Sequence, residues 1–429
     1  MIVPNAEHVE SRIPINERIS TPKMIYIWGS YPFNTGTAIT GGVIALESSL
    51  KTMIYGVLIG NIILMIYVGL LGQIGCKTGL TFVQLAKNYF GKYLSVIVSS
   101  IMVLTVFGWF NMNTAFPAEL ISQITGLNYT LVDFLLVIIF GAVVYAGING
   151  VEIISILSIP MYATVLLAAY FIILYNGHFS AVVMPIGNHK LTIIQVTALA
   201  IASYTDSGTL APDYNRWAKT VKASWLSVIS AFPFANSFSL ITGAIFVSLY
   251  YHLYGASSPF HAANPAVYLA KISIVGMCMA LLVVGINGGN GAVHALYNSA
   301  LGASNILRLR FKKVVILMTL ISVGLSSIDL WSYILQWLSL LGLLIAPIGS
   351  ALICVYFLKI TSHRFIKYGV GLPILRIAAF VGMTTGWSVS IFAKIFGYTD
   401  IFPMPAVVMI FTGISTTITA LILHKVVLS

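Results

Sequence analysis

Apolar runs of about 20 residues recur along the whole chain, and each is long enough to cross roughly 30 Å of hydrocarbon. Only 8% of the 429 residues are charged and 59% are hydrophobic, whereas a typical soluble domain has about 25% charged residues. Because lipid offers no partner to backbone N–H and C=O groups, such runs must bond internally as helices. We therefore expect an all-α integral membrane protein.

Hydropathy predicts twelve transmembrane helices and no separate soluble domain. The expected spans are 24–46, 53–75, 95–122, 130–149, 152–175, 192–212, 224–249, 267–291, 314–328, 331–357, 369–391 and 403–424. Residues 1–23 are polar and lack the apolar core of a signal peptide, so we expect a cytoplasmic tail. Residues 24–357 would form a ten-helix core, with halves at about 24–175 and 192–357. Residues 358–429 would add two transmembrane helices and a cytoplasmic C-terminus.

The distribution of lysine and arginine predicts the orientation of these spans. With the N-terminus in the cytoplasm, seventeen of the 22 basic residues fall on the cytoplasmic side. The outer side holds Lys51, Lys190, Lys271 and Lys394, and Arg376 falls inside the eleventh span. This asymmetry fits the positive-inside rule and puts both termini in the cytoplasm, with the spans in the plasma (inner) membrane. The net charge of +11 is therefore a topology signal, and we expect no nucleic-acid partner.

Two predicted spans are interrupted at corresponding positions. The first span contains Pro32 and Gly36, and the sixth contains Gly208 and Pro212. These spans begin the two five-span halves, and an odd number of spans per half requires the halves to have opposite orientations. Paired discontinuous helices in inverted halves are typical of a transporter's midplane binding site. Glycine and proline also serve ordinary packing in membrane helices, but the matching positions favour a site with these four residues as hinges.

Asp206 is the most costly residue of the sixth span. A carboxylate in the middle of a spanning helix costs about 2.5–3.5 kcal/mol on insertion scales, which makes it a functional candidate by default. Its two oxygens can accept parallel N–H bonds from an amidine or aminopyrimidine edge. A carboxyl group held away from water can also load and release a proton near neutral pH. The structural alternative, a carboxylate bonded by a helix end or by hydroxyl groups, stays open.

Other polar and aromatic residues are expected at the same depth. Trp109 falls near the centre of the third span, where its indole face could stack on a flat heteroaromatic ring. Tyr204 could supply a second ring. Asn287 and Asn290 lie in a glycine-rich part of the eighth span, and an amide presents a donor and an acceptor together. Each has a structural alternative, which is gap filling for the aromatic rings and interhelical hydrogen bonding for the amides.

Signatures of soluble enzymes are absent from the sequence. There is no HExxH, no phosphate-binding GxxxxGK[ST] and no GxSxG. We therefore expect a protein that is not an enzyme. His294, near the cytoplasmic end of its helix, is expected to be structural, and Asp213 and Arg216 are expected to form a local ion pair or a gate contact.

The chain resembles the nucleobase:cation symporter-1 family, and within it the bacterial cytosine permease branch. The resembling stretches are TAITGG at 37–42, VLIGNIILMIYVGLLGQIGCKTGL at 57–80, GWF at 108–110, SGTLAPDYNRW at 207–217, GIN at 285–287 and ALYNSALGASNI at 295–306. The resemblance implies a 5+5 inverted-repeat transporter core with discontinuous helices 1 and 6 and two additional helices. It also implies alternating access around a site between spans one, three, six and eight.

The resemblance also implies roles for single residues. Trp109 matches the stacking tryptophan, Tyr204 the aromatic residue on the other face of the base, and Asn287 the amide that reads the substrate. Asp206 stands where the cytosine permease pattern has a serine, and Val106 stands where it has a glutamine. The edge that reads the base therefore differs from that pattern. Ser207 and Thr35 complete the expected substrate contacts.

The coupling ion has two candidates. Family members that use sodium bind it through main-chain carbonyls and two hydroxyl groups. The carbonyl positions match Ser30, Phe33 and Asn287, and the hydroxyl positions match Asn290 and Gly291. An asparagine oxygen can ligate a hard cation, but Gly291 has no side chain to offer. We therefore expect either sodium at this incomplete set or a proton at Asp206, and no other metal or cofactor.

The sequence thus predicts a monomeric secondary transporter in the lipid bilayer that imports a small planar nitrogen heterocycle. The expected substrate is a nucleobase or related aminopyrimidine, such as cytosine or a thiamine-precursor pyrimidine. A purine, a hydantoin or allantoin, or a B-vitamin ring is the alternative. A channel or a non-transporting receptor is the alternative of a different class, although polar groups clustered at one depth favour a carrier.

Overall fold

The structure is a computed structural model that describes residues 8–175, 191–254, 270, 274–326, 333–365 and 371–428. Within these ranges it is helical and contains no β-strand. In the same ranges, eight helices are long and apolar enough to cross a membrane. The predicted all-helical membrane class is therefore confirmed. Parts of the expected spans eight to eleven, together with Lys190, Lys271 and Lys367, lie outside the described residues.

The helices of the first half follow the expected spans closely. They are α1 (Thr21–Ser30), α2 (Thr35–Leu46), α3 (Leu50–Thr78), α4 (Phe82–Phe90), α5 (Lys92–Thr125), α6 (Tyr129–Tyr145) and α7 (Ile148–Tyr175). The short helix α4 was not expected, and a capping box of Thr81 and Gln84 starts it because each side chain bonds a main-chain N–H that the helix leaves free.

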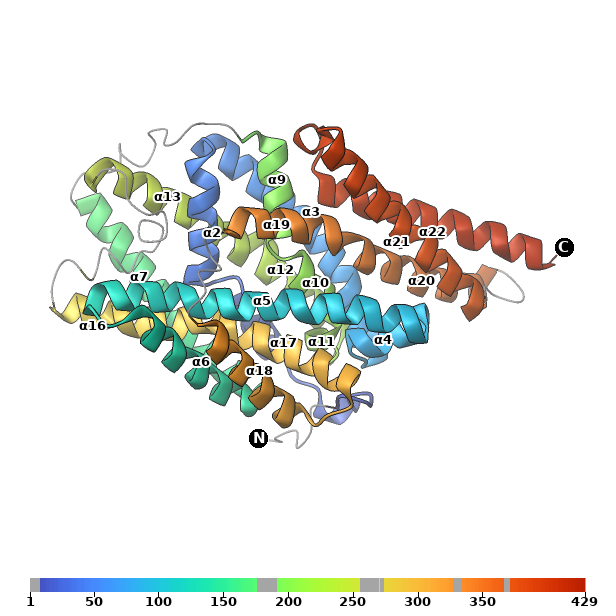
Figure 1. Ribbon diagram of the computed structural model, residues 1–429, viewed down its shortest axis with the longest axis horizontal. Helices are drawn as coiled ribbons and strands as arrows, with labels where there is room; N and C mark the ends of the chain where they lie inside the picture. Colours follow the sequence, from blue (N-terminus) through green and yellow to red (C-terminus); the bar gives the residue numbers. More distant parts are fainter. Residues whose placement is uncertain are drawn as a thin grey trace.

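The second half begins with α9 (Ile193–Ala202), α10 (Thr205–Thr209) and α11 (Ala211–Asn215). It continues with α12 (Val221–Ile229), a π-helix (Ser230–Asn236), α13 (Ser237–Tyr254), α16 (Ile274–Val283), a second π-helix (Val284–Gly288), α17 (Gly289–Leu307) and α18 (Phe311–Leu325). The last helices are α19 (Ile334–Leu344), α20 (Ala346–Phe365), α21 (Leu372–Ile395) and α22 (Met404–Leu428). Helices α5 and α17 lie side by side along the long axis, and α21 and α22 pack together at one edge (Figure 1).

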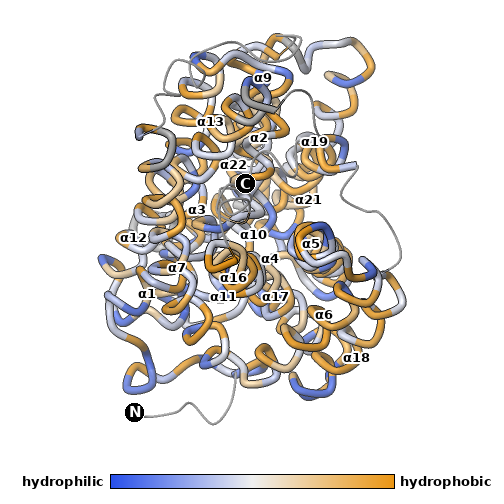
Figure 2. The backbone as a smooth tube through the Cα atoms, turned by 90° about the vertical axis from the view of Figure 1, so that its left-hand side faces the viewer, coloured by the Kyte–Doolittle hydropathy of each residue, from blue (hydrophilic) through white to orange (hydrophobic). Residues whose placement is uncertain are grey.

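The outer surface of the helices is apolar. Large side chains such as Leu104, Leu167 and Ile391 are more than half exposed, which fits contact with lipid rather than with water. Figure 2 shows α5, α16 and α17 nearly end-on, with hydrophobic residues predominating around them.

The first predicted break is present between α1 and α2. Residues 31–34 leave the helix, and Pro32 there has no N–H to donate. The side chain of Asn34 restarts the helix because its Oδ1 accepts the N–H of Thr37 at 2.9 Å. The chain therefore presents both a helix end and a helix start inside the bundle.

The second predicted break is present and has two parts. Helix α9 ends at Ala202, and a further interruption falls at Leu210, between Gly208 and Pro212. Gly208 lies inside α10, where a Cβ would come within 2.5 Å of a methyl group of Val68. Pro212 lies in the first turn of α11, a position where a helix needs no N–H donor. Close packing explains the glycine, and helix initiation explains the proline.

The expected end of span eight at 291 is wrong. Helix α17 continues to Leu307, about four turns further at 3.6 residues per turn. Residues 289–305 are all buried. A helix buried on every side has no polar face to mark its end in the sequence.

Candidate functional site

A central cavity lies where the two breaks meet α5 and α17. Its lining consists of Tyr31, Gly36, Thr37, Thr40, Trp109, Asn113, Ser203, Tyr204, Ser207 and Gly291. The space among these side chains that is open to a water-sized sphere is only about 20 Å³, far below the range for small-molecule pockets, so the cavity is nearly closed in this structure. Main-chain groups freed by the breaks, hydroxyl groups and aromatic rings all face one small volume.

Three of the six expected substrate residues line this cavity, and these are Trp109, Tyr204 and Ser207. The Tyr204 hydroxyl bonds Thr37 Oγ1 at 2.8 Å and donates to the carbonyl of Tyr31 at 3.3 Å. The ring of Tyr31 meets that of Tyr204 edge-on, with centroids 5.4 Å apart. The rings of Tyr31 and Tyr204 are thus held in place by hydrogen bonds of the two tyrosines.

Asp206 lies behind this wall rather than in it. Its Oδ1 accepts the N–H of Ser207 at 2.6 Å, while its Oδ2 is buried without a partner. The indole N–H of Trp109 faces this carboxylate but is not aligned for a hydrogen bond and has no other partner. Among the described residues no cationic side chain forms an ion pair with Asp206. The carboxylate therefore reaches the cavity through Trp109 and Ser207.

Asn287 and Thr35 do not line the cavity. Asn287 Oδ1 accepts the N–H of Thr35 at 2.7 Å, and its Nδ2 donates to Phe33 O at 2.9 Å and to Ser158 Oγ at 2.8 Å. The amide therefore completes the main-chain bonds of the broken first helix. In this structure both polar atoms of its side chain are bonded to the break and to Ser158 of α7, and the expected contact with the substrate stays a prediction.

The expected sodium ligands lie beside the same break. Asn290 Nδ2 donates to Ser30 O at 2.7 Å, and Asn290 Oδ1 is buried without a partner. Gly291 lines the cavity, and a Cβ there would lie 2.8 Å from Asn113 Oδ1. The amide of Asn113 on α5 thus occupies the place that a side chain at Gly291 would need.

Five lining residues were not singled out from the sequence. They are Tyr31, Thr37, Thr40, Asn113 and Ser203. Asn113 had a usable signal, since it is a mid-membrane amide one turn after Trp109 in TVFGWFNMN. The hydroxyl residues had none, because serine and threonine in membrane helices often bond only to the preceding turn, as Ser203 Oγ does to Ala200 O at 2.8 Å.

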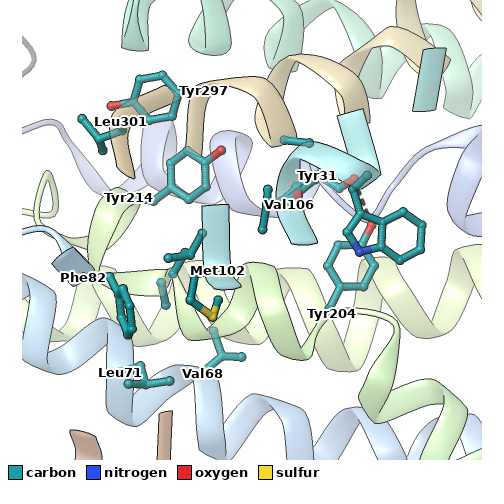
Figure 3. Close-up of a cluster of buried hydrophobic side chains, with 14 of the residues drawn as sticks. Tyr31, Val68, Leu71, Phe82, Met102, Val106, Tyr204, Tyr214, Tyr297 and Leu301 are labelled. Atoms are coloured by element: carbon teal, nitrogen blue, oxygen red, sulfur yellow. Dashed lines mark hydrogen bonds between the residues drawn. The ribbon is translucent and has the colours of Figure 1, made fainter. Parts of the chain in front are cut away.

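An apolar layer closes one side of the cavity. Figure 3 shows Tyr31 and Tyr204 at one end of a buried cluster that continues through Val106, Met102, Val68, Leu71, Phe82, Tyr214, Tyr297 and Leu301. His294 stacks on Tyr31, with centroids 4.4 Å apart, and its ring nitrogens bond Ser155 Oγ and Tyr214 Oη at 3.1 and 2.9 Å. Both nitrogens are therefore occupied, in agreement with a structural histidine.

Residues 8–20, which we call the N-terminal strap, cover the end of this apolar layer. The strap bonds three helical regions at once, through Arg18 Nη1 to Cys76 O (2.7 Å), Arg216 Nη1 to His8 O (3.1 Å) and Asn305 Nδ2 to Val9 O (2.7 Å). Asp213 Oδ1 accepts the N–H of Phe82 at 2.6 Å, and Arg216 Nε donates to the main-chain oxygen of Asp213. The expected local contact of Asp213 and Arg216 thus includes a main-chain hydrogen bond, and the Arg216 guanidinium also attracts the Asp213 carboxylate.

Comparison with known proteins agrees with this geometry. A family model described as a permease for cytosine/purines, uracil, thiamine, allantoin matches residues 12–365. The cytosine permease of Escherichia coli (strain K12) is 28% identical over 355 residues, which cover 81% of this chain and 80% of that protein. The cytosine permease of Escherichia coli O157:H7 matches with the same identity and coverage.

Two solved structures share the fold. Mhp1, a nucleobase-cation-symport-1 family transporter in a closed conformation with bromovinylhydantoin bound, has a TM-score of 0.76 at 16% identity, covering 97% of this chain and 94% of that chain. A Na+-coupled sialic acid symporter in a substrate-bound outward-open state has a TM-score of 0.67 at 13% identity, covering 95% and 90%. At such identities the likeness concerns the fold alone.

Proposed function

Because the chain belongs to the family of permeases for cytosine/purines, uracil, thiamine and allantoin, we propose that it is a secondary active transporter that imports a small planar nitrogen heterocycle. The proposed substrate is a nucleobase or related aminopyrimidine such as cytosine. The observation that carries this proposal is the cavity at the two helix breaks, walled by Trp109 and Tyr204. An aromatic wall beside hydroxyl and amide groups suits a flat ring with a polar edge.

In the proposed binding pose the ring stacks on Trp109, with Tyr204 on the opposite side. Its edge would meet Asn113, which offers an amide, and the hydroxyl group of Ser207, which bonds Tyr31 Oη at 2.8 Å. An amide gives both a donor and an acceptor, as the edge of an aminopyrimidine requires. Asn113 thereby takes the role that the sequence had assigned to Asn287.

Asp206 is proposed as the site of the coupling proton. Its carboxylate has no cationic partner among the described residues and one oxygen without a hydrogen bond, an arrangement that favours the neutral acid. The titratable groups facing it are Tyr31, Tyr67 and Tyr204. Ionised, the carboxylate attracts the N–H of Trp109, and protonated, it loses most of that attraction. The charge on Asp206 would thus influence the position of the Trp109 ring, on which the substrate stacks.

The proposed transport cycle moves the broken helices. We place twelve spans in the plasma membrane with both termini in the cytoplasm, in two inverted five-helix halves followed by two helices. Pro32, Gly36, Gly208 and Pro212 would allow the segments around the breaks to tilt, exposing the cavity to each side in turn. The chain would work as a monomer, because the cavity is built within one chain.

Other rings remain candidates for the same cavity. The chain differs from the cytosine permease pattern at Val106 and at Asp206. Val106 is fully buried in the apolar layer and offers no polar group to a substrate. A purine, a hydantoin or allantoin, or a B-vitamin ring is therefore the alternative substrate. A channel is the alternative class, and the apolar layer beside the cavity argues against it, since it provides no continuous polar lining (Figure 3).

The proposal is tested by the thermal stability of the purified protein across a panel of bases, hydantoins and vitamins. Only a ligand that binds the folded state raises the melting temperature by mass action. We expect one class of planar heterocycles to do so, and we expect Trp109→Ala to reduce that rise at equal ligand concentration. No stabilisation by any ring of the panel, or an unchanged rise in Trp109→Ala, contradicts the proposal.

A further inference from the structure

The break between α1 and α2 leaves main-chain carbonyls without helical partners, at the negative end of a helix. Such a cluster of carbonyl oxygens needs either a cation or N–H donors. In this chain Phe33 O receives a side-chain N–H from the eighth-span region, and Ser30 O receives another in addition to the main-chain N–H of Phe33, which lies 3.1 Å away. Asn290 Nδ2 lies 2.7 Å from Ser30 O, and Asn287 Nδ2 lies 2.9 Å from Phe33 O.

The chemistry around Asn287 leaves only one orientation for its amide. The N–H of Thr35 can only donate, so the atom 2.7 Å away must be the amide oxygen. The carbonyl of Phe33 can only accept, so the atom facing it must be the amide nitrogen. Exchanging the two atoms would break both bonds, and Asn287 is fully buried, so no water replaces them.

A sodium ion is a poor fit to these donors. A hard cation requires several oxygen ligands around one point, and two of the available oxygens already face amide N–H groups. Gly291 brings no oxygen, and its Cβ position lies 2.8 Å from the side chain of Asn113. One side-chain oxygen, Asn290 Oδ1, has no partner and is free to bind a cation. Turning this oxygen toward Ser30 O would turn Asn290 Nδ2 away, and Nδ2 is the atom of this side chain that donates to that carbonyl.

We propose that the amides of Asn287 and Asn290 take the place of a coupling sodium ion at the break between α1 and α2, so that closure of the cavity is independent of sodium. This inference rests on the proposed function, because it concerns the coupling of the same transport cycle. It assigns the two asparagines a defined task, which is to neutralise the carbonyl end of α1 with N–H groups that belong to the protein. The proton at Asp206 is then the coupling cation.

The test compares sodium with potassium at equal ionic strength and needs no substrate. The melting temperature of the purified wild-type protein is measured while sodium chloride replaces potassium chloride. We expect identical curves, because the break binds no sodium. A saturable rise that is specific to sodium overturns the proposal, since it shows a cation bound to the folded state.

The variant Asn290→Asp keeps the shape of the side chain. At slightly alkaline pH it places a carboxylate oxygen against Ser30 O. Two facing oxygens require a cation, so we expect this variant to gain a sodium-specific rise in melting temperature that the wild type lacks. A sodium response that is present in the wild type and unchanged in Asn290→Asp places the ion elsewhere and contradicts the proposal.

Uptake of radiolabelled cytosine into proteoliposomes with an inward proton gradient gives the second readout. We expect equal initial rates when potassium replaces sodium, and loss of uptake in potassium overturns the proposal. If cytosine is not taken up under any ionic condition, the failure concerns the proposed substrate. The melting curves then still decide the question of sodium.

Discussion

Replacing Asn287 by alanine separates a structural role of this residue from a role in reading the substrate. The variant removes the acceptor of the Thr35 N–H and the donors to Phe33 O and Ser158 Oγ. Interhelical hydrogen bonds in a membrane protein average about 0.6 kcal/mol each, which gives a lower limit of about 2 kcal/mol for three. A buried polar group left unpaired costs about 1–3 kcal/mol, so the two orphaned main-chain groups give an upper limit of about 6 kcal/mol.

These limits can be expressed as a change in melting temperature. An unfolding entropy of about 2.1 cal/mol/K per residue over 429 residues is about 0.9 kcal/mol/K. A loss of about 2–6 kcal/mol then lowers the melting temperature by roughly 2–7 °C. The shift is expected without any substrate, because the broken bonds belong to the break and not to a ligand.

Asn298→Ala is the matched control for this measurement. Asn298 is also an asparagine in the eighth-span region and fully buried, but both of its side-chain polar atoms lack a partner. The same substitution removes the same volume without breaking a hydrogen bond, so it should cost distinctly less. Equal melting temperatures of Asn287→Ala and Asn298→Ala, or a loss for Asn287→Ala only in the presence of substrate, refute the structural role.

Three further predictions follow from the cavity and the strap. Trp109→Ala should weaken binding of the heterocycle by about 1–3 kcal/mol of stacking, roughly five- to 150-fold, in a direct binding assay, and equal affinity would speak against stacking. Gly291→Ala should weaken binding, because its Cβ meets a neighbouring amide oxygen at 2.8 Å, whereas Gly285→Ala, which meets nothing within 4 Å, should behave as wild type. In a variant that keeps Cys76 as its only cysteine, Arg18→Ala should speed the labelling of Cys76 by a membrane-impermeant maleimide in inside-out vesicles. An unchanged labelling rate would show that the strap does not cover Cys76.

The helical membrane class and the break in the first helix were predicted because their signals are local. The length of the apolar runs and the proline at position 32 each act within one segment, and the family motifs agreed with the family model that matches residues 12–365. The end of span eight could not be predicted, because helix α17 is buried on all sides up to Asn305. No change of periodicity or polarity marks its terminus.

Part of the cavity lining was predicted, and the predicted residues that lie outside the lining share a physical cause. Trp109, Tyr204 and Ser207 line the cavity, but Asp206 lies one layer behind them and Asn287 is bound to the first helix. A sequence shows that a polar residue is at the right depth, but it does not show which face of the helix carries it. The direction of each side chain depends on where the helix breaks, and span six has an interruption after Ala202 in addition to the predicted one at Leu210.

Proton-driven accumulation through Asp206 is the central claim, and proteoliposomes test it most directly. Radiolabelled cytosine, or the ring that stabilises the protein best, is supplied outside with and without an inward proton gradient, to the wild type and to Asp206→Asn. The amide keeps the shape of the carboxyl group but cannot carry the proton. The account predicts that the wild type accumulates the ring above its outside concentration only with the gradient, and that Asp206→Asn inserts and binds but does not accumulate it. Equal accumulation and an equal dependence on pH in Asp206→Asn would contradict the account.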